Sequence, residues 1–256
     1  MIKITFLGTG TSQGIPVIGS EHPVCLSENP KDKRLRSSVL IQWNDCNYVI
    51  DCGPDFRQQM LSVGCNHLNG ILFTHEHADH TSGIDDIRPF FFRQGDIPVY
   101  ASDRVLSDLT RRFSYIFQTE NKYPGTPSVQ INRIKKNKGF KIEDKHVIPI
   151  EVMHNQLPVM GFRIDNFAYL TDVKFIEEDQ LIKLKDCDVL VINALRIAPH
   201  PTHLNLEQAI QMINFLKPNK AYLTHISHLL GFHEEVSAEL PANVFLAYDN
   251  LEIHSN

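Results

Sequence analysis

The stretch of residues 74–80, Thr-His-Glu-His-Ala-Asp-His, decides how this chain is interpreted. It follows the apolar run Gly70–Phe73, which predicts a β-strand, so the polar cluster lies where the strand ends. Three imidazoles and their neighbouring carboxylates are costly to bury unless a positive charge compensates them. A divalent cation provides that charge, and neutral imidazole and carboxylate are among its usual ligands. The stretch therefore predicts a metal site at a strand end.

One cluster does not complete the coordination of two ions. In an extended segment, His75 and His77 are two residues apart and can bend toward one ion, which leaves Asp79 and His80 to reach a neighbouring ion. Further ligands must then come from other strand ends. The residues of suitable type that each follow an apolar β run are His154, Asp172 and His225.

Short β-like runs interrupted by a few helical ones predict two sheets between helices, in a single domain covering residues 1–256. The expected strands are Ile2–Leu7, Ser38–Gln42, Tyr48–Asp51, Gly70–Thr74, His146–Met153, Val159–Ile164, Phe167–Thr171, Val189–Ala194, Ala221–Thr224, Val244–Tyr248 and Leu251–His254. The expected helices are Phe56–Val63, Arg104–Arg112, Leu206–Leu216 and a last short one ending at Ala238–Leu240. Asp55 is expected to cap the first of them.

The composition excludes several classes of protein. Apolar residues are 42% and charged residues 21% of the 256, as in globular chains. The net charge of −5 gives no sign of the basic face that duplex nucleic acid requires, and the basic run Arg133–Lys138 is interpreted as a solvated turn. No segment has the ~20 apolar residues of a membrane span. Five irregularly spaced cysteines and the absence of a signal peptide predict a reduced, cytoplasmic protein.

Taken together, these residues resemble the metallo-β-lactamase-fold hydrolase superfamily, whose signature is His-x-His-x-Asp-His after a strand. Later single His, Asp and His residues complete that signature, as they do here. The resemblance implies an α+β fold, a four-layer αββα sandwich with two mixed β-sheets packed between helices. It also implies two divalent cations, with zinc expected and manganese or iron as alternatives. By this resemblance, one metal is held by His75, His77 and His154, the second by Asp79, His80 and His225, and Asp172 bridges both.

A narrower resemblance comes from the glycine-rich residues 6–16, Phe-Leu-Gly-Thr-Gly-Thr-Ser-Gln-Gly-Ile-Pro, and from residues 224–228, Thr-His-Ile-Ser-His. Both are similar to the phosphoribosyl 1,2-cyclic phosphate phosphodiesterase group and, less closely, to tRNA 3′-end-processing nucleases. That group often has an additional structural zinc site after the glycine turn. This chain departs from its cysteine-rich pattern, with Ser20 at one position. A third site would therefore consist of His22, Cys25 and His228 with one further ligand.

Two cations roughly 3.5–4 Å apart activate a bridging water for attack as hydroxide at neutral pH. The catalytic residues predicted beside them are Asp79, which is also a ligand, and a histidine acid that protonates the leaving group. His203 is the first choice for the acid and His200 the second. Asp51, at a strand end, is expected to orient a ligating imidazole, and Glu76 is the weaker candidate for that role.

The predicted function is a phosphodiesterase that hydrolyses a small cyclic or nucleotide-like phosphate. Arg88–Arg93 is interpreted as pocket lining or as helix core, and Ser114–Pro127 as a loop or lid over the site. The alternatives are an RNA 3′-end-processing nuclease, a thioester or lactone hydrolase, and a non-catalytic metal-binding relative. The expected partner is a small-molecule phosphate ester, with neither nucleic acid nor membrane, and a homodimer is the assembly considered.

Overall fold

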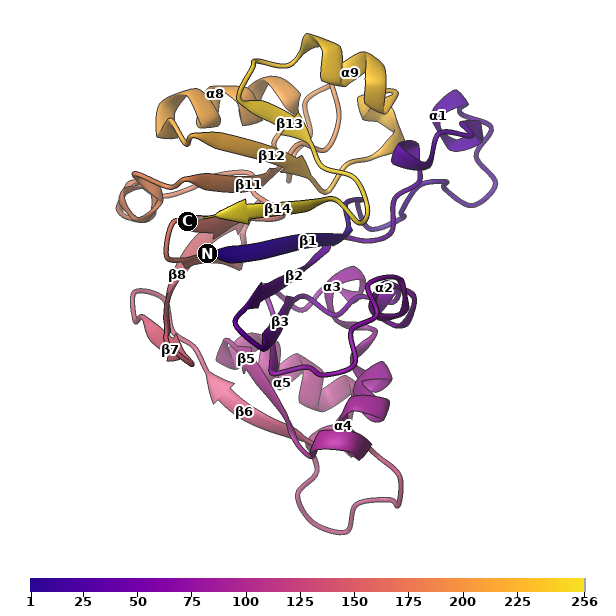
Figure 1. Ribbon diagram of the computed structural model, residues 1–256, viewed down its shortest axis with the longest axis vertical. Helices are drawn as coiled ribbons and strands as arrows, with labels where there is room; N and C mark the ends of the chain where they lie inside the picture. The colour runs from indigo at the N-terminus through magenta and orange to yellow at the C-terminus, as the bar shows by residue number, and fades with distance from the viewer. Residues whose placement is uncertain (256) are drawn as a thin grey trace.

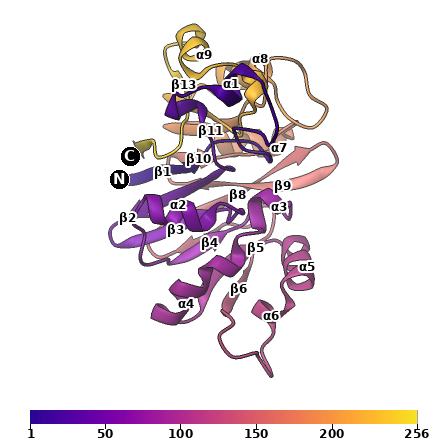
Figure 2. The ribbon, with the colours of Figure 1, turned by 90° about the vertical axis from the view of Figure 1, so that its right-hand side faces the viewer.

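A computed structural model describes residues 1–255 of the chain. Two β-sheets of seven strands each lie face to face, and helices cover the outer surface of both (Figures 1 and 2). Each sheet is mixed, with one antiparallel half and one parallel half. The expected α+β sandwich of four layers is confirmed.

The first sheet has the strand order β14-β1-β2-β3-β4-β5-β6 and holds the N-terminal half of the fold. Pairing is antiparallel from β14 through β3 and parallel from β3 through β6. Its strands are β1 (Ile2–Gly8), β2 (Ser38–Trp43), β3 (Cys46–Ile50), β4 (Gly70–Leu72), β5 (Ile97–Ala101), β6 (Val129–Arg133) and β14 (Glu252–Ser255).

The second sheet has the order β13-β12-β11-β10-β9-β8-β7. Pairing is antiparallel from β7 to β10 and parallel from β10 to β13, so the carboxyl ends of β10, β11 and β12 lie at one edge. Its strands are β7 (Phe140–Ile142), β8 (Lys145–His154), β9 (Leu157–Ile164), β10 (Phe167–Tyr169), β11 (Val189–Asn193), β12 (Lys220–Thr224) and β13 (Val244–Leu246).

Helices on the first sheet follow its parallel strands, and a second set covers the other sheet (Figure 2). The α-helices are α1 (Pro23–Leu26), α2 (Phe56–Ser62), α3 (Ala78–Thr81), α4 (Arg88–Gln94), α5 (Asp103–Arg112), α6 (Ser114–Phe117), α7 (Glu178–Leu181), α8 (Leu206–Leu216) and α9 (His233–Glu239). The 3-10 helices are η1 (Pro30–Asp32), η2 (Ile84–Ile87), η3 (Ile182–Leu184) and η4 (His228–Leu230). Within residues 1–255, no helix combines the length and the apolar character that a membrane crossing requires.

Alternation along the strands explains the layers. In β1, Ile4 and Phe6 are fully buried between the two sheets, whereas Leu7 points to the opposite face, in the apolar cluster that includes Phe56 and Met60 of α2. The outer face of the second sheet is covered in the same way by α8, through Ala209 and Ile213. Three apolar layers therefore hold four layers of secondary structure together.

Most expected elements are present, with three kinds of difference. Strands β5, β6 and β7 were not predicted; they have only five, five and three residues, and β6 and β7 are half exposed. Several other strands end one or two residues earlier than expected, β4 at Leu72 among them. The expected capping role of Asp55 is wrong: its carboxylate makes no cap hydrogen bond and instead accepts from the Arg36 guanidinium at 2.9 and 3.1 Å.

Candidate metal centre

The polar residues predicted at the centre, two as metal ligands and Asp51 as a residue that orients a ligand, lie where strands of both sheets end. Asp51 follows β3, Asp172 comes three residues after β10, and His225 follows β12. All three have left-handed backbone, with φ of 65°, 55° and 54°. A non-glycine residue in that region costs of the order of 1–3 kcal/mol and is retained where its side chain must point in one direction. Strain of this kind is also present elsewhere, for example at Asn44 and Asn137, so at these three residues it supports the candidate site only together with their side-chain chemistry.

His75, His77 and His154 form one group of imidazoles. The Nε2 atom of His75 lies 2.9 Å from Nδ1 of His77. The ring of His154, the last residue of β8, lies 5.4 Å from that of His77 and 6.1 Å from that of His75, measured between centroids. His75 is fully buried, whereas His77 is exposed, so this group forms the side of the centre that faces solvent.

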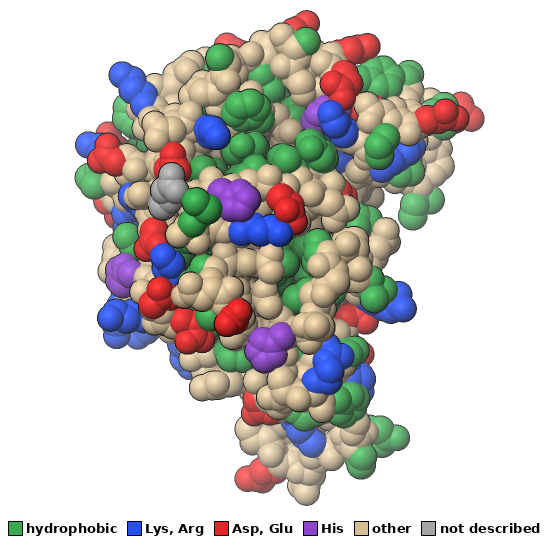
Figure 3. Space-filling view, in the orientation of Figure 1, with side chains coloured by type: hydrophobic (Ala, Val, Ile, Leu, Met, Phe, Trp, Pro, Cys, Tyr) green, Lys and Arg blue, Asp and Glu red, His purple; other side chains and the backbone are tan. Residues whose placement is uncertain are grey.

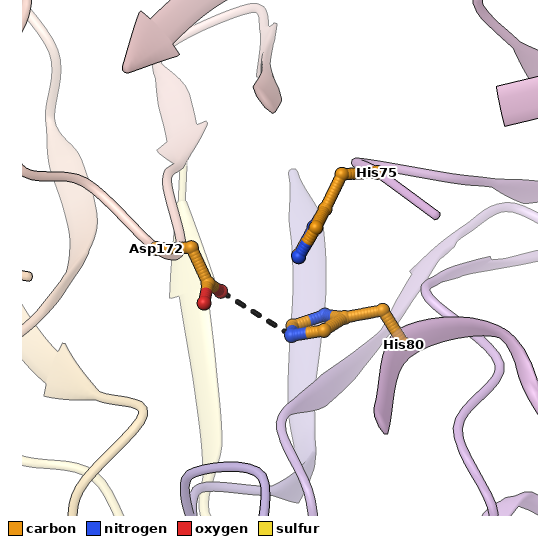
Figure 4. Close-up of side chains that lie close together, drawn as sticks. All are labelled: His75, His80 and Asp172. Atoms are coloured by element: carbon orange, nitrogen blue, oxygen red, sulfur yellow. Dashed lines mark ion pairs between the residues drawn. The ribbon is translucent and has the colours of Figure 1, made fainter. Parts of the chain in front are cut away.

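A second group surrounds the Asp172 carboxylate. Its Oδ2 atom lies 3.2 Å from His80 Nε2, and its Oδ1 atom lies 3.3 Å from His225 Nε2 (Figure 4 shows the first pair, with His75 beside it). Asp79 Oδ2 is 3.2 Å from His80 Nε2 and 3.7 Å from His225 Nε2. Both of these imidazoles belong to the set predicted for the second ion. Asp172 also has a carboxylate oxygen within 4.8 Å of a ring nitrogen of His75 and of His154, so its carboxylate lies between the two predicted sets.

Buried imidazole nitrogens that lack a hydrogen-bond partner indicate whether a cation fits this centre. Nε2 of His80 and both ring nitrogens of His225 are buried and have no hydrogen-bond partner. Burial lowers the pKa of His80, but the carboxylates of Asp79, Asp172 and Asp51 outweigh it and raise that pKa well above the ordinary value. The negative potential that favours a proton here also favours a divalent ion. The clusters of His and Asp side chains are compatible with a metal site.

Asp51 fixes two of the imidazoles through hydrogen bonds. Its Oδ2 atom lies 2.7 Å from His80 Nδ1 and accepts from the Thr74 hydroxyl at 2.8 Å. That hydroxyl oxygen lies 3.0 Å from His75 Nδ1. Because the hydroxyl hydrogen is directed at Asp51, the pattern assigns a proton to Nδ1 of both imidazoles and turns both Nε2 atoms toward the centre. The orienting role expected of Asp51 therefore includes His75, through Thr74.

His203 lies inside the centre, and His200 lies outside it. His203 Nε2 is 3.1 Å from Asp172 Oδ1, and its ring is 4.4 Å from that of His154. Burial lowers the pKa of His203 to about 4, although the bond to Asp172 opposes this. His200 contacts the far side of the same ring, with 3.1 Å between the two Nδ1 atoms. Of the two candidates for the acid, only His203 reaches the carboxylate of the centre.

The residues expected at a third metal site are only partly assembled. The rings of His22 and His228 lie 4.9 Å apart, and Nδ1 of His228 is buried without a partner. His22 Nδ1 accepts from Val24 N, so this imidazole caps α1. Within the described part of the chain, the groups of three ligand atoms lying within 4.8 Å of one another do not include His22, Cys25 or His228.

The segments interpreted as pocket and lid contact each other. Phe90 of α4 is buried in the core, which agrees with the interpretation of Arg88–Arg93 as helix core. Arg93 lines a cavity of about 610 Å³ between α2 and α4, together with apolar residues such as Met60 and not with the predicted ligands. In the lid segment, Tyr115 donates to Asp85 at 3.0 Å and the Gly125 carbonyl accepts from Arg88. These contacts attach the segment to η2 and α4.

Two supporting residues were missed by sequence reasoning. Thr74 connects Asp51 to His75, as described above. Asn193, at the end of β11, accepts from Val173 N at 2.6 Å and donates to Val173 O at 3.1 Å, which holds the turn beside Asp172. Asn193 does follow an apolar strand, so its position was a signal of the same kind as the one that identified Asp172.

Comparisons with known proteins agree with the fold. The family model described as "Beta-lactamase superfamily domain" matches residues 46–226. The chain belongs to this family, its fold is that of the metallo-β-lactamase-fold hydrolases, and its His and Asp clusters are compatible with a metal site. The predicted superfamily is therefore confirmed.

The individual relatives are named for different activities. A solved structure described as a new diphosphatase from the PhnP family is 36% identical, with a TM-score of 0.93 over 100% of this chain and 98% of that one. An octanoyltransferase of Porphyromonas gingivalis is 40% identical over 98% of this chain and 51% of its own length, so the chain spans about half of that relative. A ribonuclease Z of Methanosarcina acetivorans is 30% identical over 45% of this chain and 35% of its own.

Proposed function

We propose that this protein is a binuclear metal-dependent hydrolase that cleaves a small, nucleotide-like phosphoric diester or diphosphate. The observation that carries the proposal is the buried set of unsatisfied imidazole nitrogens around Asp79 and Asp172. One cation is proposed between His75, His77 and His154, and a second between Asp79, His80 and His225, with Asp172 shared. Zinc is the proposed metal, because these nitrogen and oxygen ligands suit it.

A pair of bound cations would supply an activated water and stabilise the charge that develops on the phosphorus oxygens. The remaining requirement is a proton for the leaving oxygen. His203 is the proposed donor, since its Nε2 points at the same Asp172 oxygen as His225. His200 and the Thr202 hydroxyl contact the Nδ1 side of its ring, which holds the imidazole in place.

A phosphate substrate is supported by the likeness to the PhnP-family diphosphatase, which extends over the whole chain at 36% identity. RNA processing has less support. Lysines and arginines are interspersed with acidic residues on the face shown in Figure 3. In the basic run, Lys136 pairs with Glu151 at 2.7 Å and Arg133 with Asp103 at 3.4 Å. Both pairs reduce the positive potential that a phosphate backbone would encounter.

An acyl thioester is the second candidate substrate. The observation in its favour is the 40% identity to the longer octanoyltransferase of Porphyromonas gingivalis, a name that concerns octanoyl transfer. The same centre would serve both reactions, because each needs an activated water and a stabilised oxyanion. Retention of every expected ligand type argues against a non-catalytic relative.

The test is hydrolysis by zinc-loaded protein of four probes: bis-p-nitrophenyl phosphate, a dinucleoside diphosphate, octanoyl-coenzyme A and a tRNA precursor. We expect turnover of the first two and its loss with a chelator or in Asp172→Asn. Asp32→Asn is the matched control, because Asp32 is also buried and accepts a backbone N–H and a hydroxyl. Turnover of only the thioester would transfer the assignment to the second candidate, and turnover of none would remove the proposal.

A further inference from the structure

Helix α5 lies against the metal-binding loop without providing a ligand. Its apolar side, with Val105 and Leu109 fully buried, is fixed in the core of the first sheet. Arg104, Asp108 and Arg112 are four residues apart and therefore lie along one stripe of the helix. The stripe alternates in charge, and both of its arginines contact the loop of residues 74–80, or the threonine just after it.

Arg112 donates to the backbone of that loop at its centre. One terminal nitrogen, Nη2, donates to the Glu76 carbonyl oxygen at 2.8 Å and to the Thr81 hydroxyl oxygen at 2.8 Å. The Thr81 hydroxyl in turn donates to the His77 carbonyl oxygen at 2.8 Å. The Arg112 guanidinium is therefore bonded directly to the carbonyl before His77 and, through the Thr81 hydroxyl, to the carbonyl of His77 itself.

The guanidinium is itself held in one orientation. Nε of Arg112 donates to Asp108 Oδ2 at 2.5 Å, and the side chain is 26% exposed. Its neighbour Arg111 also pairs with Asp108 at 2.5 Å, but its side chain is 76% exposed. Charge-assisted bonds from a fixed donor are stronger and more directional than those of a mobile one. The two adjacent arginines thus differ mainly in whether they reach the metal loop.

Arg104, eight residues before Arg112 on the same stripe, makes a second contact with the loop. It donates to the Pro158 carbonyl in β9 and lies 3.1 Å from Glu76 Oε2. Glu76 is therefore held by its carbonyl oxygen through Arg112 and by its carboxylate through Arg104. This use of the Glu76 carboxylate differs from the imidazole-orienting role considered from the sequence.

We propose that Arg112 is a positioning residue that sets the geometry of the His-x-His-x-Asp-His loop and so the affinity for the cation between His75, His77 and His154. The inference rests on the proposed metal centre. Mutation of a residue that hydrogen-bonds to a metal ligand typically changes metal affinity about 10–100-fold. Because Arg112 acts on backbone carbonyls and not on a ligand ring, the lower part of that range, about 10-fold, is expected for Arg112→Gln.

The test compares Arg112→Gln, Arg112→Lys and Thr81→Val with Arg111→Gln as the matched control. Zinc affinity is measured by chelator competition, and cobalt is added separately to record the visible spectrum of the coordinated ion. We expect weaker zinc binding and a changed cobalt spectrum for Arg112→Gln, a smaller loss for Arg112→Lys, and wild-type values for Arg111→Gln. Combining Thr81→Val with Arg112→Gln should add little, because both changes interrupt one chain of bonds.

Each failure has a separate meaning. Wild-type affinity and spectrum in Arg112→Gln, with two ions bound to the wild type, would overturn the positioning role and leave the proposed function intact. An equal loss in Arg111→Gln would also overturn it, by showing a general effect of charge. A wild type that binds no metal would remove the proposed function itself. If Arg112→Gln does not fold, Arg112→Lys and Thr81→Val carry the same comparison.

Discussion

Replacing Asp51 with asparagine should reverse the protonation of two imidazoles with almost no change in volume. The carboxylate accepts three hydrogen bonds, from Thr74 N and the Thr74 hydroxyl at 2.8 Å and from His80 Nδ1 at 2.7 Å. An asparagine keeps one acceptor, which the Thr74 N–H can use. Its NH₂ group then faces His80, whose Nδ1 must accept, so the ring proton moves to Nε2 and points into the centre.

The magnitude follows from these bonds. A hydrogen bond to a buried charge contributes roughly 1.5–3 kcal/mol, and asparagine restores part of it, so we expect unfolding to become easier by about 2–3 kcal/mol. At about 2–4 °C for each kcal/mol, the melting temperature should fall by about 4–12 °C. A misdirected ligand nitrogen should weaken metal binding about 10–100-fold, which corresponds to about 1.4–2.7 kcal/mol.

The assay joins two readouts. Nitrogen-15 NMR of the histidine rings reports which nitrogen of His80 and His75 carries the proton, and calorimetric titration reports zinc affinity. Asp32→Asn is again the control: it removes a buried carboxylate that accepts from the Ser27 hydroxyl and His233 N, without touching an imidazole ring. The reasoning is refuted if Asp51→Asn keeps the wild-type tautomers and affinity, or if the control loses affinity equally.

Three other predictions follow from single contacts. His203→Gln should lower kcat about 10²–10⁴-fold while zinc content stays at the wild-type level, as expected for a lost acid, and a loss of zinc would make His203 a ligand instead. Gly53→Ala should lower the free energy of unfolding by about 1–3 kcal/mol, because its new Cβ would lie 2.1 Å from the Asp79 carbonyl oxygen. The variant should therefore melt at a lower temperature, and an unchanged melting curve would contradict this. Burial lowers the pKa of His233 to about 4, below the ~6.5 of an unfolded chain, so its neutral form stabilises the fold above pH ~6.5 and that stability is lost as pH falls toward 4. Urea unfolding at several pH values should show this loss in the wild type and less of it in His233→Asn, and parallel curves would refute it.

The layered fold was predictable because burial is recorded in the alternation of apolar residues. Strands such as β1 and β2 place every second side chain between the sheets, and that period is visible in the sequence. The half-exposed strands β6 and β7 have only five and three residues, so their alternation is too short to stand out, and they owe their place to pairing with neighbours. Asp55 shows the same limit, since its partner Arg36 comes from a distant segment that a local capping rule cannot consider.

The candidate site was predictable where its residues end strands. Asp172 and His225 were selected because each follows an apolar run, and sheet topology brings such ends to one edge. Supporting residues were harder to identify. Arg112 lies on a helix whose span was predicted, yet nothing in its spacing shows that its guanidinium meets the Glu76 carbonyl. Contacts between a helix and a loop 36 positions away depend on packing, which the sequence does not display.

Anomalous diffraction at the zinc absorption edge, from crystals of the zinc-loaded protein, tests the paired-cation centre most directly. The account predicts two peaks on either side of Asp172, one bounded by His75, His77 and His154 and the other by Asp79, His80 and His225. A single peak, or peaks away from Asp172, would contradict it.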